Sequence, residues 1–263
     1  MKRLLVAAIT LFGLAAGLAC GGGRDEIEAS GEITIVPDLT RRREGLTEQE
    51  TLELFQAIMQ RRAEFFDGSA EVTVNEDQTL TVMYKDIQTD IAHDLYFVPA
   101  NFRIRAPQRE GDMIICLTGP DQEVMVPREN LIYSQEGTRL IPRCRLDDGR
   151  PANIAWEEVE TLNYGIIDNL DIASVSLVTE AGPTLIVALN EEGIEKLSYV
   201  SSTLINLPMG IFIDELIAGP KVAQPIDNGQ VAVAGLSLRE ARIMRAQLRA
   251  GAVPAPYTVR LAE

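Results

Sequence analysis

Apolar and polar positions over residues 31–66 change from a strand pattern to a helix pattern. A short apolar run at 33–36, closed by Pro37, predicts a strand within residues 31–39. A helix is predicted over 46–65, where Thr47 and Glu50 have the spacing of a capping box. Its apolar stripe comprises Leu52, Phe55, Ile58, Met59 and Phe66, and the charged residues off that stripe are Arg61, Arg62 and Glu64.

The next stretch alternates with the period of strands. Segments 71–74 and 79–84 are joined by polar residues, which predicts a hairpin. A short helix is expected over 87–95 and a strand over 101–105. The resulting order is strand, helix, strand, strand, helix, strand, which is the ferredoxin-like order.

Residues 107–155 have the weakest periodicity in the chain. Strands are expected at 113–117 and 131–133, and a turn at 147–151, where Asp, Gly and Pro gather.

The C-terminal part has clearer signals of where helices and strands begin and end. Asn190 is placed to cap a helix with Ile194, Leu197, Val200 and Leu204 on one face. Ser237 and Glu240 form a second capping-box pair, opening a helix that ends at Gly251. Strands are expected at 174–178, 184–189, 210–213, 230–234 and 257–261.

The N-terminus has the layout of a signal peptide. Lys2 and Arg3 precede an uncharged, mostly apolar run at 4–19, which is short for a membrane span. Small residues lead up to Cys20, in a permissive form of the bacterial lipobox. We therefore expect a signal peptide over 1–19, lipidation of Cys20 and a glycine-rich tether over 20–30. The alternative is an ordinary cleaved signal with an incidental cysteine.

These features predict a protein held by its lipid on the outer face of the cytoplasmic membrane, or on an outer membrane if the cell has one. The formal net charge is −15. So acidic a surface repels nucleic acid and anionic headgroups, so we expect no nucleic-acid partner. The uncharged stretch 197–213 is interrupted by Asn206, Pro208 and Gly210, and a helix followed by a strand explains it better than a membrane span.

Cys116 and Cys144 are the two cysteines that follow Cys20. Outside the cytoplasm an even pair favours a disulfide, whereas two buried thiols are the alternative. The sequence leaves both open, because it does not show whether the two backbones approach each other.

Catalytic patterns are missing from the sequence. His93 is the only histidine, which excludes histidine clusters, and we find neither a nucleophile elbow nor a phosphate-binding glycine loop. The carboxylates Asp168, Asp171, Asp214 and Glu215 lack the spacing of a calcium loop. We therefore expect no enzyme activity, no metal and no cofactor.

Residues 184–256 resemble the head of the first periplasmic domain of SecD, a protein-export factor. The segment 186–193 resembles that family's strand and Asn-x-x-Gly helix opening, and 210–214 resembles its strand ending in an aspartate turn. Residues 237–256 resemble its closing helix and following turn. The matching structural positions are Asn190, Gly193, Asp214, Pro220, Gly229, Gly235, Gly251 and Pro254.

Two features depart from that family. Glu215 stands where the family usually has Gly. The family's transmembrane helices, with their proton-relay carboxylates, have no counterpart in the sequence. More weakly, residues 50–105 resemble the base of the same periplasmic domain.

The resemblance implies an α+β fold with a ferredoxin-like base and an inserted α+β head. The base would comprise 31–106, with 252–263 returning to it. The head would comprise 107–251 and be SecD-like most clearly over 165–251.

The resemblance also implies a function. SecD assists the Sec translocon, and its head is thought to contact the emerging chain. We therefore expect a non-enzymatic accessory of Sec-type protein export, whose partners are exported polypeptides or translocon subunits. The alternatives are an envelope scaffold unrelated to translocation and, last, a hydrolase using carboxylates.

Overall fold

The computed structural model describes residues 30–120, 122–136, 139–159 and 165–261. The predicted signal peptide, Cys20 and nearly all of the predicted tether lie outside these residues. The predicted α+β class is confirmed, since helices and several antiparallel sheets alternate along the chain. Within the described residues, no helix has the length and apolar character needed to cross a membrane.

The base is a four-stranded antiparallel sheet with helices on one face. Its strands are β1 (Gly31–Pro37), β2 (Ser69–Val74), β3 (Leu80–Lys85) and β17 (Tyr257–Leu261), in the order β17-β1-β3-β2. Helices α1 (Glu48–Phe65) and α2 (Thr89–Phe97) accompany it. The predicted capping box at Thr47 and Glu50 is present. Short 3-10 turns occur at Leu39–Arg41, Arg128–Asn130 and Asn169–Asp171.

One strand that the sequence pattern placed in the base belongs to another sheet. The predicted strand at 101–105 is β4 (Phe102–Pro107), which pairs with β11 (Trp156–Glu158) and β14 (Gly210–Ile213). The C-terminal β17 takes the fourth place in the base instead. The order of elements was right, but a local pattern does not say which partner a strand will find.

The head contains two further sheets and helix α3 (Glu191–Thr203). The first has the order β11-β4-β14-β15, with β15 at Glu215–Ala218. The second contains β12 (Ile172–Val178), β13 (Thr184–Leu189) and β16 (Gln230–Val233).

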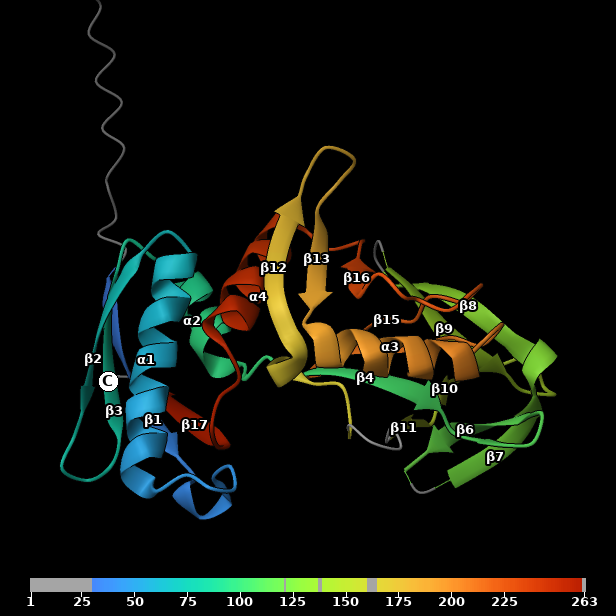
Figure 1. The fold of residues 1–263 in the computed structure, drawn as a ribbon, viewed down its shortest axis with the longest axis horizontal. Coiled ribbons are helices and arrows are strands. Elements are labelled where there is room, and N and C mark those ends of the chain that lie inside the picture. The colour runs from blue at the N-terminus through green and yellow to red at the C-terminus, as the bar shows by residue number, and fades with distance from the viewer. Residues whose placement is uncertain (1–29, 121, 137–138, 160–164, 262–263) are drawn as a thin grey trace, which may run out of the picture.

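Helix α4 (Leu238–Ala250) joins the two parts of the molecule. It lies between α1 and α2 of the base and strands β12 and β13 of the head (Figure 1). Ile243 and Ala246 pack in the base core, whereas Ala241 and Leu248 pack in the head core. The helix was expected to belong to the head alone. Because apolar residues of α4 pack in both cores, the helix belongs to the base as well as to the head.

Residues 109–154 form a β-lobe at the far end of the head. Six antiparallel strands curl into one sheet: β5 (Arg109–Glu110), β6 (Met113–Gly119), β7 (Gln122–Pro127), β8 (Leu131–Glu136), β9 (Arg139–Arg145) and β10 (Pro151–Ile154). The expected strands at 113–117 and 131–133 are confirmed as parts of β6 and β8.

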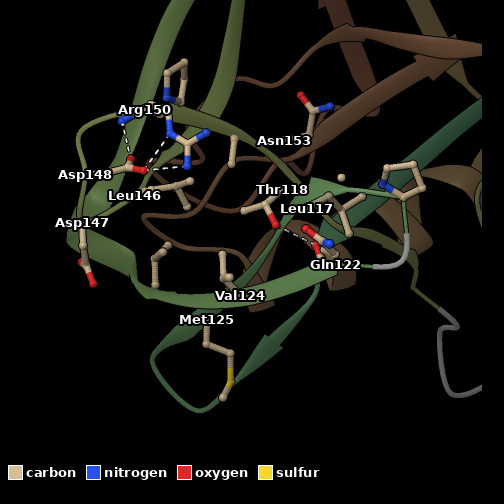
Figure 2. A pocket seen from close by; sticks show the side chains of 15 residues that line it. Leu117, Thr118, Gln122, Val124, Met125, Leu146, Asp147, Asp148, Arg150 and Asn153 are labelled. Atoms are coloured by element: carbon tan, nitrogen blue, oxygen red, sulfur yellow. Dashed lines mark hydrogen bonds and ion pairs between the residues drawn. The ribbon is translucent and has the colours of Figure 1, made fainter.

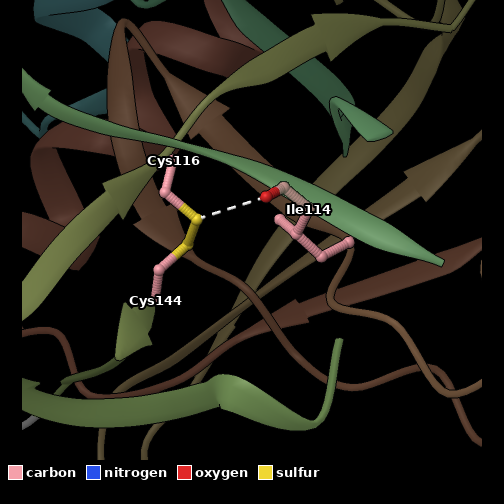
Figure 3. The surroundings of a disulfide bond; sticks show 3 residues. All are labelled: Ile114, Cys116 and Cys144. Atoms are coloured by element: carbon pink, nitrogen blue, oxygen red, sulfur yellow. Dashed lines mark hydrogen bonds between the residues drawn. A yellow bond between two sulfur atoms is a disulfide. The ribbon is translucent and has the colours of Figure 1, made fainter. Parts of the chain in front are cut away.

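A disulfide joins Cys116 of β6 to Cys144 of β9 inside this lobe (Figure 3). The two Cα atoms lie 6.2 Å apart and both side chains are fully buried. The two strands do not pair directly, because β10 lies between them: Cys116 stands opposite Ile154 and Cys144 opposite Ala152. The disulfide therefore links β6 and β9 directly, which the backbone hydrogen bonds between strands do not.

Candidate functional site

The most apolar of the larger pockets lies where base and head meet, and we call it the junction pocket. Its volume is about 490 Å³. Three segments far apart in the sequence line it: the end of α2, the β14–β15 turn and one face of α4. Its lining residues are Asp94, Val98, Ile213, Asp214, Glu215, Glu240, Ile243, Met244 and Gln247.

Side chains from the base hold the α2 end of the pocket in place. Arg62 of α1 donates hydrogen bonds to the carbonyl oxygens of Leu95 (2.9 Å), Val98 (2.8 Å) and Pro99 (2.7 Å). Gln247 of α4 donates to the carbonyl oxygen of Asp94 at 2.9 Å. The last carbonyls of a helix have no partner within the helix, and a cation there interacts favourably with the helix dipole.

Arg62 thereby corrects an expectation from the sequence. It was placed off the apolar stripe of its helix, with Arg61 and Glu64, yet its side chain is fully buried. The hydroxyl of Tyr257 accepts a hydrogen bond from Arg62 and donates one to the carbonyl oxygen of Tyr96 at 2.7 Å. Burial raises the pKa of Tyr257, which Arg62 only partly offsets, so this hydroxyl stays protonated as a donor.

Side chains from the head hold the next residues, Ala100 to Phe102. The Asp214 carboxylate accepts from the backbone N–H groups of Ala100 (2.7 Å) and Asn101 (3.1 Å). Asn169 donates to the carbonyl of Ala100 and accepts from the N–H of Phe102. Both Ala100 and Asp214 have positive φ, at 61° and 60°. The connection between base and head is thus held from both sides in a backbone conformation that few residues adopt freely.

The pocket combines an apolar floor with an acidic rim. Ile213 and Ile243 are buried, while Val98 is 38% exposed. Four of the lining residues are acidic and none is basic. Arginines from outside the lining pair with two of the acids: Arg239 with Asp94 at 2.8 Å, and Arg139 with Glu240.

The carboxylate of Glu240 remains ionised despite its position. Partial burial raises its pKa, but hydrogen bonds from Ser237 and the nearby Arg139 outweigh this effect and hold the pKa below its usual value. Glu240 therefore contributes a negative charge to the rim at neutral pH, and the acidic rim suits a ligand that is apolar with a positive group beside it.

A larger groove of about 960 Å³ opens on the β-lobe (Figure 2). Its walls come from β6, β7 and the turn between β9 and β10. The rim charges Asp148 and Arg150 pair with each other at 2.6 Å, and Asp148 is held ionised because hydrogen bonds from Arg150 lower its pKa. With its cation already paired and its lining mixed in polarity, this groove offers a less defined set of contacts than the junction pocket.

Among the residues singled out from the sequence, Asp214 and Glu215 line the junction pocket, and Glu215 and Gly235 line a smaller hollow next to it. The others take structural places elsewhere. Gly229 and Pro220 lie in loops of the head, Gly251 follows α4 with φ of 105°, and the carbonyl of Pro254 accepts from the N–H of Arg43 at 2.7 Å.

Asn190 and Gly193 form the opening of α3. The side chain of Asn190 accepts from the N–H of Gly193 at 2.8 Å, as expected of an N-cap. A Cβ on Gly193 would lie 2.9 Å from the Cβ atoms of Asp171 and Leu189. Asp171 itself is buried and paired with Lys196 at 2.8 Å. The glycine of the Asn-x-x-Gly pattern is therefore needed because the start of α3 packs closely against Asp171 and Leu189.

We expect Gly193→Ala to lower the free energy of unfolding by about 1–3 kcal/mol, because the methyl group overpacks this contact. Alanine otherwise favours a helix over glycine, so the sign of the change is diagnostic. Urea unfolding measures it. Ser202→Ala, on an exposed position of the same helix, should change stability by less than about 0.5 kcal/mol. A stabilised Gly193→Ala protein would contradict the packing account.

The acidic residues weighed as calcium ligands do not converge. Asp168 faces Arg103 at 3.6 Å, Asp171 pairs with Lys196, and Asp214 caps backbone N–H groups. Within the part of the chain that the structure describes, no three His, Cys, Asp or Glu side chains are grouped to hold a metal. His93 is half exposed and stacks on Phe97, with ring centroids 3.8 Å apart.

Sequence reasoning missed the pocket itself. Val98, Ile213 and Met244 are ordinary apolar residues in their local patterns, and only the packing of α4 across both subdomains brings them together. The position of Arg62 was one signal of its burial. It lies on the inner side of α1, near the buried residues Met59 and Ala63.

Comparison with known proteins gives a family match within the head. Residues 163–255 match the family model of the SecDF P1 head subdomain. By structure, the chain is similar to "a membrane component SecDF that enhances protein export", with 18% identity, a TM-score of 0.57, and coverage of 88% of this chain and 99% of that one.

It is also similar to a crystal structure of SecDF in the super-membrane-facing form, with 19% identity and a TM-score of 0.59. That match covers 90% of this chain and 30% of the SecDF chain. No curated protein matches by sequence. Residues 163–255 thus correspond to the SecDF P1 head subdomain, and the described chain shares the fold of the SecD periplasmic domain.

Proposed function

We propose that this protein is a non-enzymatic, extracytoplasmic accessory of Sec-type protein export that contacts emerging or unfolded polypeptide, or the translocon, through its head. The observation that carries the proposal is the match of residues 163–255 to the SecDF P1 head subdomain. One similar structure belongs to a SecDF that "enhances protein export". Lipidation of Cys20 would hold the protein at the membrane, as the N-terminal sequence indicates.

The junction pocket gives this role a contact site. Unfolded polypeptides present apolar side chains that a folded protein buries, and a partly open apolar pocket offers them a place to bind. The pocket floor includes Val98 and Met244, neither of which is fully buried. The firmly held backbone around it keeps the pocket formed before a ligand arrives, which lowers the entropic cost of binding.

Photo-crosslinking in cells tests the proposal. A photoreactive residue at Val98 or Met244 should form adducts with nascent secretory chains or Sec subunits. The matched control is Met83 on β3, an exposed apolar residue (43%) in the base sheet. It should form few such adducts. Cell fractionation verifies that each variant reaches the membrane.

Two outcomes count against the proposal. If all probes crosslink one envelope protein unrelated to export, the fold serves as a scaffold instead. If a correctly located protein gives no adducts from either pocket position, the junction pocket is not a polypeptide contact.

A further inference from the structure

Glu215 differs from the other acidic residues around the junction pocket. It opens strand β15 and pairs with Ile213 across a turn formed by Asp214. Its side chain is exposed and lines both the junction pocket and the adjoining hollow formed by Glu136, Arg139, Ile141, Leu216, Gly235 and Glu240. It therefore stands where the two spaces meet.

The neighbouring acids already have partners. Asp94 and Glu240 pair with Arg239 and Arg139, and the oxygens of Asp214 accept hydrogen bonds from Ala100 and Asn101. The backbone of Glu215 pairs with Ile213, but its side chain makes no ion pair or hydrogen bond with the described residues. Among the lining acids, it carries the charge most available to a ligand.

The floor beside Glu215 is apolar. Ile213 precedes it by two residues, and Ile243 and Met244 of α4 line the same pocket. A ligand that satisfies both surfaces has an apolar side chain for the floor and a cation for the rim. The net charge of −15 adds a long-range attraction for positively charged ligands.

We infer that Glu215 makes the junction pocket selective for extended polypeptide segments that carry a lysine or arginine next to an apolar side chain. This inference rests on the proposed function, because it names the class of segment that the same pocket accepts. Glycine, which the sequence resemblance leads one to expect at this position, would leave the apolar floor without an available charge.

A peptide-binding experiment tests the selectivity. Two fluorescent peptides, identical except that one has Lys and its twin Gln beside a single Leu, are titrated with the full-length protein purified from membranes. The wild-type protein should bind the Lys peptide about fivefold more tightly than the Gln peptide, the upper end for an exposed ion pair. Raising the salt concentration should shrink this ratio.

Glu215→Gln should bring the ratio of the two affinities close to one. The matched control is Glu180→Gln, which removes the same charge from the turn between β12 and β13, outside the lining of the pocket. Both variants change the overall charge equally, but Glu180 lies outside the pocket. Glu180→Gln should therefore keep the fivefold preference.

The outcomes separate this inference from the proposed function. Equal binding of both peptides to the wild-type protein overturns the selectivity and leaves polypeptide binding intact. A preference for Lys that persists in Glu215→Gln also overturns it, since the charge then acts from elsewhere. Failure of the wild-type protein to bind either peptide overturns both.

Discussion

Arg62→Met is expected to lower the free energy of unfolding by about 3 kcal/mol or more, because three carbonyl groups lose a donor that reaches them from a fully buried position. The guanidinium reaches the carbonyls of Leu95, Val98 and Pro99 with two different nitrogens. Methionine fills a similar volume but donates nothing. The side chain is fully buried, so solvent does not replace the lost bonds.

The adjacent arginine provides a matched control. Arg61 is only partly buried, and its Nε donates to the carbonyl oxygen of Ala57 within the same helix. Arg61→Met should therefore change stability by less than about 0.5 kcal/mol. Arg62→Lys should recover only part of the loss, because an ammonium lacks the planar fork that reaches separate carbonyls. Denaturant unfolding with a shared m-value compares all three variants.

A small loss in Arg62→Met would show that the carbonyls find other donors, with Gln247 the nearest candidate. Its amide already lies 2.9 Å from the carbonyl oxygen of Asp94 and 3.3 Å from that of Leu95. A double variant with Gln247→Leu would then be expected to lose far more than the sum of the single losses. Such non-additivity is typical of side chains that share one hydrogen-bond network.

Much of the fold could be predicted because local sequence signals agree with the tertiary structure. Thr47 and Glu50, Ser237 and Glu240, and Asn190 each open a helix as expected. These caps depend on side chains within three residues of each other, so they need no information about distant contacts.

The predictions that were wrong concern contacts between residues far apart in the sequence. Strand β4 has the right local pattern but pairs with β14, more than a hundred residues away in sequence, instead of joining the base sheet. Helix α4 has apolar residues on more than one face, which the sequence does not assign to two different cores. The junction pocket depends on both features and was therefore not predictable from local periodicity.

The β-lobe was the part that sequence patterns described least, and its disulfide leads to the second large effect. Replacing both Cys116 and Cys144 with alanine is expected to lower the free energy of unfolding by about 3–4 kcal/mol. The two residues are 28 positions apart, so the bond closes a sizeable loop and restricts the unfolded chain. Alanine avoids placing a polar hydroxyl in the two fully buried positions.

Reductant provides the control for this prediction. It should destabilise the wild-type protein by a similar amount and leave the double alanine variant unchanged. If reductant also destabilised the double alanine variant, that effect could not come from the Cys116–Cys144 bond. Two free thiols at these positions in the unreduced, unfolded protein would show that the bond does not form, and the predicted loss would then fall to the cost of two small cavities.

Hydrogen exchange can locate the effect within the molecule. β6 and β9 each pair with only half of the short strand β10, so they depend on the disulfide to stay together. Their amides should lose protection first in the double variant, whereas amides of β1 and β3 in the base should keep theirs. Equal loss in lobe and base would instead mean that the two unfold as one unit, because shared helix α4 transmits the change from the head core to the base core.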